Sequence, residues 1–496
     1  MLLVDLEPAA KIACGYNGKM LTGNCMKTIT KHYIDGAFVE SHGREVKEII
    51  NPSNNKVIGS VILGDEEDTR RAIAAANRAF TKFASSTKEE RAGILRRLHE
   101  VVAARIDDLT AIMIEEYGGT TQFSTLIVKM AADAFLHAEE ALQQLQLVQS
   151  WGKTTVTLEP VGVAGLITAW NSNALFICLK LASAIAAGCT TVIKPSELSP
   201  LQTQVLIECF HEARLPKGIY NVVIGRGDVV GTELVRNPDV AKISFTGSVG
   251  VGEKIMRDGA ATMKRVTLEL GGKSPNILLD DVDLEKAIPI ALGIAFMNSG
   301  QACAAGTRLL VPSSRLDAVK KAIFDAMSAI QVGDPSDKKT AVGPMVTDKQ
   351  YERIQSYIRK GIEEGAQILI GGEGHPQGLE GGNFVKPTVF VNVKNDMAIA
   401  QEEIFGPVLC VIAYDTEEEA IRIANDSRYG LHAYVSGADL QRARRVAAQL
   451  RAGRIAINGM LDDPQAPWGG FKFSGVGREF GKFGIDAFLE PRAILE

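Results

Sequence analysis

The alternation of short apolar runs with helical segments between residues 163 and 270 constrains the fold more than any other feature of this sequence. Five apolar runs alternate there with four segments of helical periodicity, and the runs are 163–169, 190–193, 220–224, 242–245 and 265–270. Because a crossover helix returns the chain to the same edge of a sheet, this order predicts a parallel sheet with helices on both faces. Ligands of such sheets bind at the carboxyl ends of the strands, where we therefore expect the functional residues.

The segments on either side of this sheet extend the α/β pattern. From Glu66 to Gln149 apolar residues recur at helical spacing, which predicts helices that pack on the sheet. The Gly-rich stretch 371–382 is expected to be a surface turn region. A second α/β unit is expected after residue 280, with helices over 283–297 and 313–330, a strand over 307–312, and further strands near Val389, Val408, His432 and Ile455.

Length and charge exclude several classes of protein. At about 150 residues per domain, the 496 residues correspond to roughly three domains or two large ones. The 54 basic and 59 acidic residues give a net charge of −5, which disfavours nucleic acid as a partner. No apolar stretch is long enough for a membrane span, and the acidic start of the chain lacks the features of a secretion signal. We therefore expect a cytoplasmic protein without a membrane partner.

The cysteines and histidines do not indicate a metal site. The seven cysteines include no CxxC pair, and the seven histidines form no HExxH motif. No metal cofactor is therefore expected, and most of the cysteines are expected to be reduced thiols in the core. Residues 1–25 show weak periodicity, and we expect them to be a disordered or dispensable tail before a fold that begins near Met26.

Two glycine-containing turns after predicted strands are candidates for a dinucleotide site. Gly225, Gly227 and Gly231 form a GxGxxxG pattern, one residue longer than the Rossmann fingerprint, and taken alone this pattern is about as often a plain turn. The sequence FTGS at 245–248 ends the next strand and opens another helix. The free N–H groups and the dipole of such a helix favour a pyrophosphate, which strengthens the dinucleotide interpretation.

A charged pair follows the preceding strand. Lys194 and Glu197 lie in the sequence KPSE, where Pro195 ends the strand. The pair is either a solvated loop pair or a binding site for the ribose on the adenine side of a dinucleotide. In the second case the carboxylate repels a 2′-phosphate and favours NAD, although Lys194 can still attract that phosphate, so NADP stays open.

Three further side chains are candidates for catalysis. Cys303 lies among small residues in GQACAAG, which leave room for a substrate carbon to approach the sulfur. Glu269 ends the fifth apolar run before two glycines, and Asn171 follows Trp170 at the end of the first run. Taken singly, a cysteine in such a place is more often an inert core thiol, a glutamate a surface carboxylate and an asparagine a turn residue. A cysteine hydrolase is a poor second interpretation, because QAC continues neither as a caspase motif nor as a papain motif.

Taken together, these residues resemble the aldehyde dehydrogenase superfamily, whose members depend on NAD or NADP. The resemblance extends from Ile34 to the end of the chain. It rests on seven separate motifs in the family's order, namely TAWN at 168–171, KPSE at 194–197, FTGS at 245–248, LELGGKSP at 268–275, GQACAAG at 300–306, EEIFGPV at 402–408 and PWGGFKFSG at 467–475.

The resemblance implies a role for each matched residue. Cys303 matches the nucleophile that forms a thiohemiacetal and then a thioester with the aldehyde. The Asn171 amide and the backbone N–H of Cys303 match the oxyanion donors, and Glu269 matches the base that activates water to release the carboxylic acid. Residues implied to bind the cofactor are Thr168, Trp170, Lys194, Ser196, Glu197, Gly227, Phe245, Gly247, Ser248, Leu270, Glu402 and Phe405.

The resemblance also implies the architecture. Residues 26–140 and 160–270 are expected to form a Rossmann-like NAD-binding domain with a parallel sheet, and residues 271–471 a second α/β domain that carries catalysis. Residues 141–159 and 472–496 are expected to form a small β arm and a C-terminal tail. Such an arm pairs subunits, so a homo-oligomer is expected, either a dimer or a tetramer.

The sequence departs from the family's pattern around Asn171. Ala169 replaces a proline before the Trp-Asn pair, and Ser172 and Asn173 replace an aromatic-proline pair after it. We expect these changes to loosen the turn that aims Asn171 and to make this wall of the substrate tunnel more polar. The stretch 460–463, with two aspartates, is expected at the tunnel mouth, where it would disfavour anionic aldehydes and leave a neutral or cationic substrate.

Two other functions remain open on the sequence. A coenzyme A-acylating relative would transfer the acyl group to coenzyme A rather than to water, and the presence of Glu269 argues against it. A family member that has lost turnover would serve as a binding or structural protein. The retained Cys303, Glu269, Asn171 and Glu402 argue against that interpretation.

Overall fold

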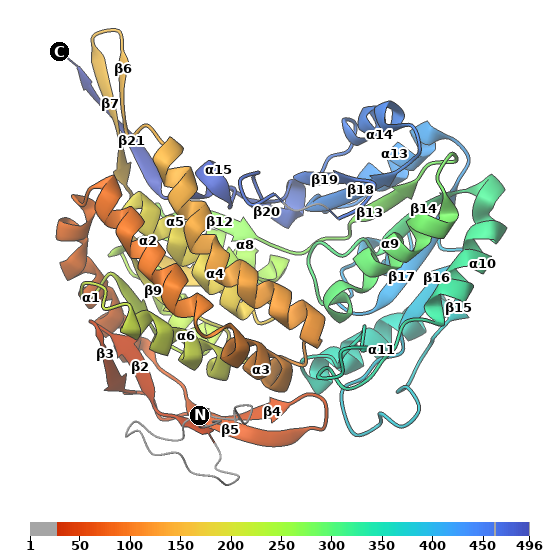
Figure 1. The fold of residues 1–496 in the computed structure, drawn as a ribbon, viewed down its shortest axis with the longest axis horizontal. Coiled ribbons are helices and arrows are strands. Elements are labelled where there is room, and N and C mark those ends of the chain that lie inside the picture. Colours follow the sequence, from red (N-terminus) through yellow and green to blue (C-terminus); the bar gives the residue numbers. More distant parts are fainter. Residues whose placement is uncertain (1–26, 461–462, 496) are drawn as a thin grey trace, which may run out of the picture.

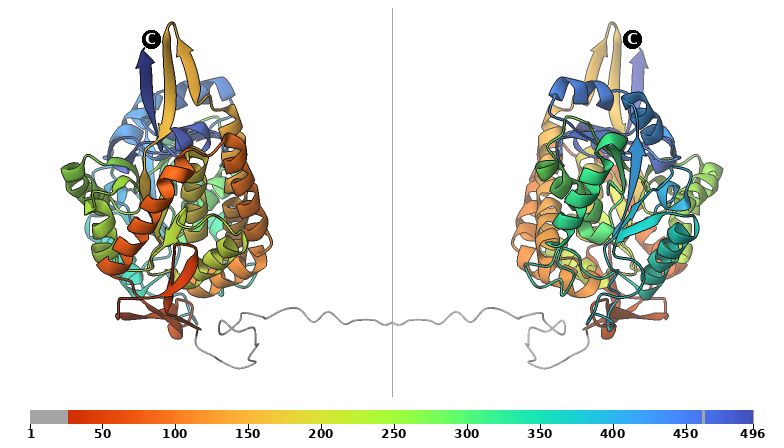
Figure 2. Two further views of the ribbon diagram at one scale, coloured as in Figure 1. Left: turned by 90° about the vertical axis from the view of Figure 1, so that its left-hand side faces the viewer. Right: turned by 90° about the vertical axis from the view of Figure 1, so that its right-hand side faces the viewer.

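The computed structural model describes residues 27–460 and 463–495, so the predicted tail 1–25 and residues 461–462 of the predicted tunnel mouth lie outside the described residues. Two α/β units lie side by side, and a narrow β arm projects from the first of them (Figures 1 and 2). The first unit is built on an eight-stranded sheet of order β20-β12-β11-β8-β9-β10-β2-β3. The second is built on a seven-stranded sheet of order β15-β16-β17-β14-β13-β18-β19.

The five predicted apolar runs form the centre of the first sheet. They are all parallel, as predicted, and are β8 (Val163–Ile167), β9 (Thr190–Lys194), β10 (Tyr220–Val222), β11 (Val240–Thr246) and β12 (Arg265–Glu269). Two antiparallel strands, β2 (Lys31–Ile34) and β3 (Ala37–Glu40), extend one edge. Nearly every residue of the five parallel strands is buried, which explains why they read as continuous apolar runs in the sequence.

Helices connect these strands and cover the sheet. The crossovers are α5 (Asn173–Ala187), α6 (Pro200–Glu212), α7 (Thr232–Arg236) and α8 (Val249–Gly259), and the N-terminal helices are α1 (Glu66–Ala84), α2 (Lys88–Ala103), α3 (Ile106–Tyr117) and α4 (Thr121–Gln144). Helix α5 is followed by Gly188, its C-cap residue, which has a φ of +90°. A side chain there would also collide with the guanidinium of Arg91, since a Cβ would lie 2.5 Å from one of its nitrogens. Glycine is therefore required for the chain to leave this helix.

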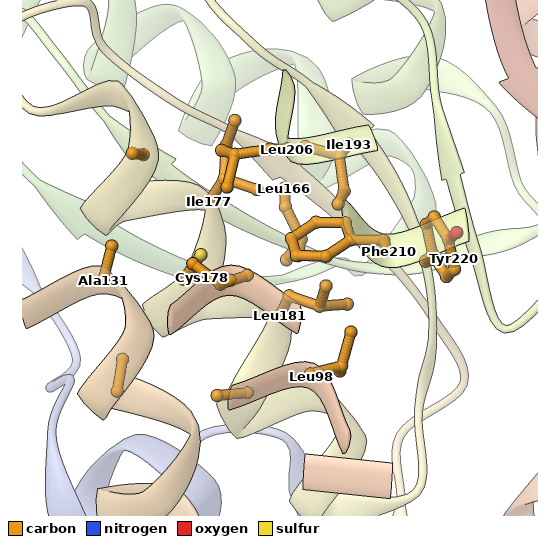
Figure 3. Packing of buried hydrophobic residues seen from close by; sticks show 14 of the residues in the cluster. Leu98, Ala131, Leu166, Ile177, Cys178, Leu181, Ile193, Leu206, Phe210 and Tyr220 are labelled. Carbon is orange, nitrogen blue, oxygen red and sulfur yellow. The ribbon is translucent and has the colours of Figure 1, made fainter. Parts of the chain in front are cut away.

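The largest hydrophobic core lies between the first sheet and helices α2, α4, α5 and α6. Figure 3 shows Phe210 of α6 between strand residues Ile193 and Leu166 and the α5 residue Leu181. Burial of each large aliphatic side chain in such a core contributes about 1.5–3 kcal/mol. This packing holds the helices of the first unit on its sheet.

The second unit repeats the parallel architecture. Its six parallel strands are β13 (Pro275–Leu278), β14 (Arg308–Pro312), β16 (Thr388–Val391), β17 (Val408–Tyr414), β18 (His432–Ser436) and β19 (Arg454–Ile457), with β15 (Gln367–Ile370) antiparallel at one edge. Its helices are α9 (Leu284–Phe296), α10 (Leu316–Met327), α11 (Asp348–Glu363), α12 (Ala398–Gln401), α13 (Glu417–Asn425) and α14 (Leu440–Ala447). The predicted α/β class with parallel sheets is confirmed.

Two small three-stranded sheets complete the fold, one antiparallel and one mixed. The arm consists of β6 (Val148–Trp151), β7 (Thr154–Pro160) and β21 (Leu489–Leu495), and it projects away from both units (Figure 2). Strands β1 (Lys27–Ile29), β4 (Val46–Asn51) and β5 (Lys56–Ile62) form the other sheet.

The C-terminal residues contribute to the first unit as well as to the arm. Of the predicted 472–496 segment, β20 (Gly475–Val476) pairs with β12 of the first sheet and α15 (Gly481–Asp486) packs on α4 and α5. Only β21 of this segment joins the arm. Within the described ranges, no helix is both long enough and apolar enough to cross a membrane.

Candidate active site

The carboxyl ends of the first sheet meet the second unit at a cavity of about 240 Å³. Cys303, Glu269 and Asn171 all line it, although they come from three different parts of the chain. Asn171 follows β8, Glu269 ends β12, and Cys303 lies in the loop between α9 and β14. The structure therefore brings together the three residues that the sequence predicted to be catalytic.

Cys303 is half-buried and lines this cavity. Burial, together with the nearby negative charges of Glu403 and Glu269, raises its pKa to about 12. A thiol with this pKa is protonated at neutral pH, so it needs a proton acceptor before it can act as a nucleophile.

Glu269 supplies a carboxyl group without a fixed partner. Its side chain is buried, and neither carboxylate oxygen has a hydrogen-bond partner. Burial and the charge of Glu479 raise its pKa well above the usual range, against the opposite effect of Lys180 and Arg478. At Gly469 a Cβ would lie 2.8 Å from Oε1 of Glu269, so this glycine leaves the room that the carboxylate occupies. A buried carboxylate that is free to accept a proton is suited to be a general base.

The turn that carries Asn171 is held by hydrogen bonds. The amide nitrogen of Asn171 donates to the carbonyl of Gln301 at 3.0 Å, which leaves its second N–H for a substrate oxygen. Ser172 Oγ and Asn298 Nδ2 donate to the Asn171 carbonyl at 2.8 and 3.1 Å. Asn173 Nδ2 donates to Thr203 Oγ1 at 3.1 Å. We expected Ser172 and Asn173 to loosen this turn, whereas their own side chains tie it down.

A second cavity of about 500 Å³ continues from the first along the edge of the sheet. The two cavities share part of their walls, so they form one continuous groove. Nine of the predicted cofactor residues line the second cavity, namely Thr168, Trp170, Lys194, Ser196, Glu197, Gly227, Phe245, Gly247 and Ser248. Helix α8 begins at Val249, directly after this wall, and its N-terminal end is a favourable place for a phosphate.

Lys194 and Glu197 form an ion pair in the wall of the groove. The distance from Lys194 Nζ to Glu197 Oε2 is 2.8 Å, and the lysine side chain is almost fully buried. Although burial alone would raise the pKa of Glu197, the charge and hydrogen bond of Lys194 outweigh it and lower this pKa. The carboxylate is therefore ionised, and it neutralises the lysine beside it.

Of the three remaining predicted cofactor residues, two line the groove and one lies outside it. Leu270 and Phe405 line the Cys303 cavity, and the Phe405 ring stands edge-on to Trp170 at a centroid distance of 5.4 Å. Glu402 does not line the cavity: it is exposed and accepts a hydrogen bond from Tyr357 at 2.6 Å. Its neighbour Glu403 lines the cavity instead.

The backbone explains why the two adjacent glutamates differ. The chain is extended at Glu402, so consecutive side chains point to opposite sides and only one of the two can face the groove. The carboxylate of Glu403 accepts the backbone N–H of Gly272 at 3.1 Å, and burial raises its pKa to about 7. The structure therefore places Glu403 rather than the predicted Glu402 in the wall of the groove.

Two residues of α11 in the cavity wall were not predicted. Gln350 donates to the carbonyls of Ile404 and Phe405 at 3.2 and 2.8 Å, and Arg353 donates to the carbonyl of Glu403 at 2.7 Å. The two residues are three positions apart and so lie on one face of the helix. This spacing was the only signal for them in the sequence, and it is common in surface helices.

Comparison with known proteins decides the family. The family model described as "Aldehyde dehydrogenase family" matches residues 38–494.

The chain belongs to the aldehyde dehydrogenase family.

Similar proteins support this assignment over nearly the whole chain. A putative aldehyde dehydrogenase of Staphylococcus haemolyticus is 44% identical over 470 residues, which cover 95% of this chain and 99% of that relative. Aldehyde dehydrogenase C from Pseudomonas syringae, solved with NAD+ and octanal, has a TM-score of 0.93 and 42% identity, covering 95% of this chain and 98% of its own. Betaine aldehyde dehydrogenase from Staphylococcus aureus, solved with NAD+, has a TM-score of 0.91 and 38% identity, covering 94% of both chains.

These findings confirm the predicted family and the predicted fold. They also confirm an oxidoreductase of the aldehyde dehydrogenase type and NAD as the cofactor of the family, since several of the similar structures contain NAD+. No cluster of three or more His, Cys, Asp or Glu side chains suited to a metal ion occurs in residues 27–460 and 463–495.

Proposed function

We propose that this protein oxidises an aldehyde to the carboxylic acid, with Cys303 as the nucleophile and Glu269 as the base for the hydrolytic water. The oxyanion donors in this proposal are the side-chain amide of Asn171 and the backbone N–H of Cys303. The observation that carries it is the meeting of Cys303, Glu269 and Asn171 in one cavity, which opens into a groove large enough for a dinucleotide.

The groove fits NAD by its chemistry. Ser248 and the start of α8 suit the pyrophosphate, and the Lys194–Glu197 pair suits the ribose hydroxyls on the adenine side. The Glu403 carboxylate, next to Cys303, suits the ribose on the nicotinamide side. When bound, NAD supplies the hydride acceptor of the oxidation.

The chain's residues favour NAD over NADP. Lys194 is already neutralised by Glu197, and Asp228 and Asp258 also line this part of the groove. Asp228 and Asp258 are each paired with an arginine, Arg226 and Arg236, and Lys254 also lines the groove. We propose that the Glu197 carboxylate at the ribose position repels a 2′-phosphate, so that NAD is preferred.

The side chains supply each proton and charge that the reaction needs. Cys303 loses its proton to Glu269, whose raised pKa suits it to accept one, and the thiolate attacks the aldehyde carbon. The developing oxyanion accepts hydrogen bonds from the free N–H of Asn171 and from the Cys303 N–H. After oxidation the acyl group is a thioester on Cys303. Glu269 releases the thiol proton to solvent and then deprotonates a water that attacks the thioester carbon, so the carboxylic acid leaves and the Cys303 sulfur is freed.

A third cavity, of about 110 Å³, suits the hydrocarbon part of the substrate. It lies between α4, α5 and α15, and its α5 wall, formed by Leu175 and Leu179, begins one helical turn after Asn171. Phe480 also lines it and packs on Trp468, with ring centroids 5.7 Å apart. Most of the lining is apolar, and Asp133 is its one carboxylate among the described residues. We therefore propose a neutral or cationic aldehyde with an apolar chain, and the octanal bound by the P. syringae relative supports an aliphatic one.

The arm supports a homo-oligomer. Trp151 and Leu495 expose 68% and 80% of their surface in the single chain, and Val148 exposes 64%. Apolar side chains exposed together on a projecting sheet favour an interface. We propose a dimer or a tetramer, and light scattering of the purified protein measures which is formed. A cytoplasmic location stays a prediction.

Activity measurements test the proposed function. The purified protein is mixed with NAD+ and a series of aldehydes, NADH is followed by absorbance, and the product is identified by NMR. Cys303→Ala is expected to abolish NADH formation, whereas Cys209→Ala, which removes a buried thiol of the first unit, keeps it. Full activity of Cys303→Ala would contradict the mechanism. An acyl-coenzyme A product, formed only when coenzyme A is added, would favour the acylating alternative.

A further inference from the structure

A buried polar cluster joins the Asn171 turn to the loop that carries Cys303. At its centre is Tyr117, the last residue of α3, whose side chain is fully buried. The Tyr117 hydroxyl donates to Asn298 Oδ1 at 2.8 Å and accepts from Gln301 Nε2 at 3.3 Å. The hydroxyl thus connects two residues of the Cys303 loop that lie more than 180 positions away in the sequence.

Asn298 passes this contact on to the proposed oxyanion site. Its amide nitrogen donates both to the Asn171 carbonyl at 3.1 Å and to the Gln301 carbonyl at 3.0 Å. The Gln301 carbonyl also accepts the side-chain N–H of Asn171. One asparagine therefore sets the relative position of the Asn171 turn and of the peptide two residues before Cys303.

The backbone of this loop needs such support. Asn298, Ser299 and Gly300 have φ values of +51°, +58° and +73°, so three consecutive residues are left-handed. Residues other than glycine adopt this conformation only where their surroundings hold them. The side-chain oxygen of Asn298 is held by Tyr117, and the hydroxyl of Ser299 is held by the backbone N–H of Gly343 at 2.8 Å.

We propose that Tyr117 is a positioning residue of the active site, which through Asn298 aligns Asn171 and the Cys303 N–H for the oxyanion. This inference rests on the proposed function, because it assigns a role toward the same oxyanion. The ring of Tyr117 also contacts Trp170, with centroids 5.7 Å apart, and so braces the segment just before Asn171. This support comes at the turn where the sequence lacks the family's prolines.

The hydroxyl is suited to a permanent contact. Burial raises the pKa of Tyr117 well above the usual range, against the smaller effect of its hydrogen bond to Asn298. The group therefore remains a neutral donor at every pH at which the protein is folded. The hydroxyl uses its one donor toward Asn298 Oδ1 and accepts a hydrogen bond from Gln301 Nε2. The contact with Tyr117 thus fixes the oxygen side of the Asn298 amide.

The test is Tyr117→Phe, which keeps the ring and its contact with Trp170. Tyr414→Phe is the matched control, since this hydroxyl is also buried and donates to the Leu278 carbonyl at 2.7 Å in the second unit. We expect kcat for the best aldehyde to fall about ten- to a hundredfold in Tyr117→Phe, because small misplacements of catalytic groups have effects of this size. The KM for NAD+ is expected to stay within about twofold, since the groove is unchanged. Tyr414→Phe is expected to keep the parent kcat.

Two further measurements separate positioning from general destabilisation. Hydrolysis of p-nitrophenyl acetate by Cys303, corrected with Cys303→Ala, needs the oxyanion donors without any cofactor, and we expect Tyr117→Phe to slow it by a similar factor. In a double-mutant cycle, Tyr117→Phe is expected to add almost nothing to Asn298→Ala, because both remove the same contact.

Each other result overturns the inference. A kcat of Tyr117→Phe equal to that of the parent protein would overturn it. So would a result in which Tyr117→Phe and Tyr414→Phe lose the same activity and the same Tm. Additive effects in the cycle would show that Tyr117 does not act through Asn298. An absence of aldehyde oxidation by the parent protein would instead contradict the proposed function, and ester hydrolysis would still report on Tyr117 in that case.

Discussion

Replacement of Glu269 by glutamine separates the two halves of the proposed reaction. The amide has nearly the same volume as the carboxyl group but cannot accept a proton from water. Each turnover needs a proton acceptor twice, once for the Cys303 thiol and once for the hydrolytic water. In the variant the half-buried thiol can still lose its proton to solvent, whereas the water must lose its proton beside the thioester, where Glu269 is the proposed base. We therefore expect Glu269→Gln to accumulate the acyl-enzyme and to release its product slowly.

The size of the effect follows from the surroundings of Glu269. General base catalysis contributes about 10²- to 10⁴-fold. In the part of the chain that the structure describes, Glu269 is the one carboxylate that both lines the Cys303 cavity and has no hydrogen-bond partner, so no other residue is placed to replace it. Removal of its negative charge also lowers the pKa of Cys303, which that charge helps to raise. Steady-state turnover is expected to fall by about 10²- to 10⁴-fold, while the thiolate forms more readily.

Stopped-flow absorbance measures both effects. Mixing Glu269→Gln with NAD+ and aldehyde is expected to give a burst of up to one NADH per subunit, followed by a slow steady rate. The burst rate is expected to depend less steeply on pH than the initial rate of the parent. Cys303→Ala controls for the burst, since it cannot form a thioester. Steady turnover of Glu269→Gln at the parent rate, or the absence of a burst with an equally slow first turnover, would refute this reasoning.

The same substitution has a consequence for stability, and its sign follows from linkage. The pKa of Glu269 is higher in the folded than in the unfolded protein, so the folded state binds the extra proton. Its carboxyl group therefore destabilises the fold increasingly as pH rises from the unfolded pKa of about 4.3 through the folded pKa. We expect Glu269→Gln to raise Tm at pH 8 and to leave it almost unchanged at pH 4, which differential scanning calorimetry measures. If Glu269→Gln instead had a lower Tm than the parent at pH 8, the raised pKa of the buried Glu269 carboxyl group would be contradicted.

Other residues of the groove give matched predictions. Glu403→Gln is expected to raise the KM for NAD+ about tenfold or more and Glu402→Gln to leave it unchanged, since only the former lines the cavity; equal effects would contradict this placement. Because the pKa of Glu403 is about 7, the parent's KM for NAD+ is expected to fall as pH rises from 6 to 8, and this dependence should vanish in Glu403→Gln. Glu197→Gln is expected to raise kcat/KM for NADP about tenfold by removing a carboxylate that repels the 2′-phosphate, and an unchanged NAD/NADP ratio would argue against this role. Leu179→Trp is expected to reduce kcat/KM for octanal but not for propanal, because Leu179 lines the third cavity. The control Leu126→Trp, on the exposed face of α4, should change neither value. Equal losses for both aldehydes in Leu179→Trp would exclude the third cavity as the site of the substrate's hydrocarbon chain.

The meeting of Cys303, Glu269 and Asn171 in one cavity could be predicted because of their position in the local pattern. Asn171 and Glu269 each follow a buried strand of a parallel sheet, and the carboxyl ends of such strands meet at one edge. Cys303 lies in a loop of small residues whose place at this edge came from the order of the motifs. Local periodicity and motif order were sufficient to bring these side chains together.

The two glutamates at 402 and 403 show the limit of motif matching. Both belong to the same motif, and the choice between them depends on which way an extended residue faces after a four-residue helix. That direction is set by the contact of Glu403 with Gly272 and by the contact of Glu402 with Tyr357. Neither contact is visible in the sequence, since the partners lie 131 and 45 positions away.

The Asn171 turn shows how distant contacts can reverse a local expectation. The loss of prolines predicted a looser turn, because proline restricts φ within its own residue. The structure restricts the same turn with hydrogen bonds from Ser172, Asn298 and, through Asn298, from Tyr117. Packing of α3 against the Cys303 loop decides this, and it has no signature in the residues around Asn171.

By itself the sequence determined the α/β architecture, the family and the edge of the sheet at which Cys303, Glu269 and Asn171 meet. It could do so because apolar periodicity and turn residues encode local structure, and because parallel strands bring their carboxyl ends together. Only the tertiary structure decided which of two neighbouring carboxylates faces the groove and that Tyr117 supports the oxyanion site. These features depend on the direction of single side chains and on hydrogen bonds between residues far apart in the chain, which are fixed only when the two units pack together.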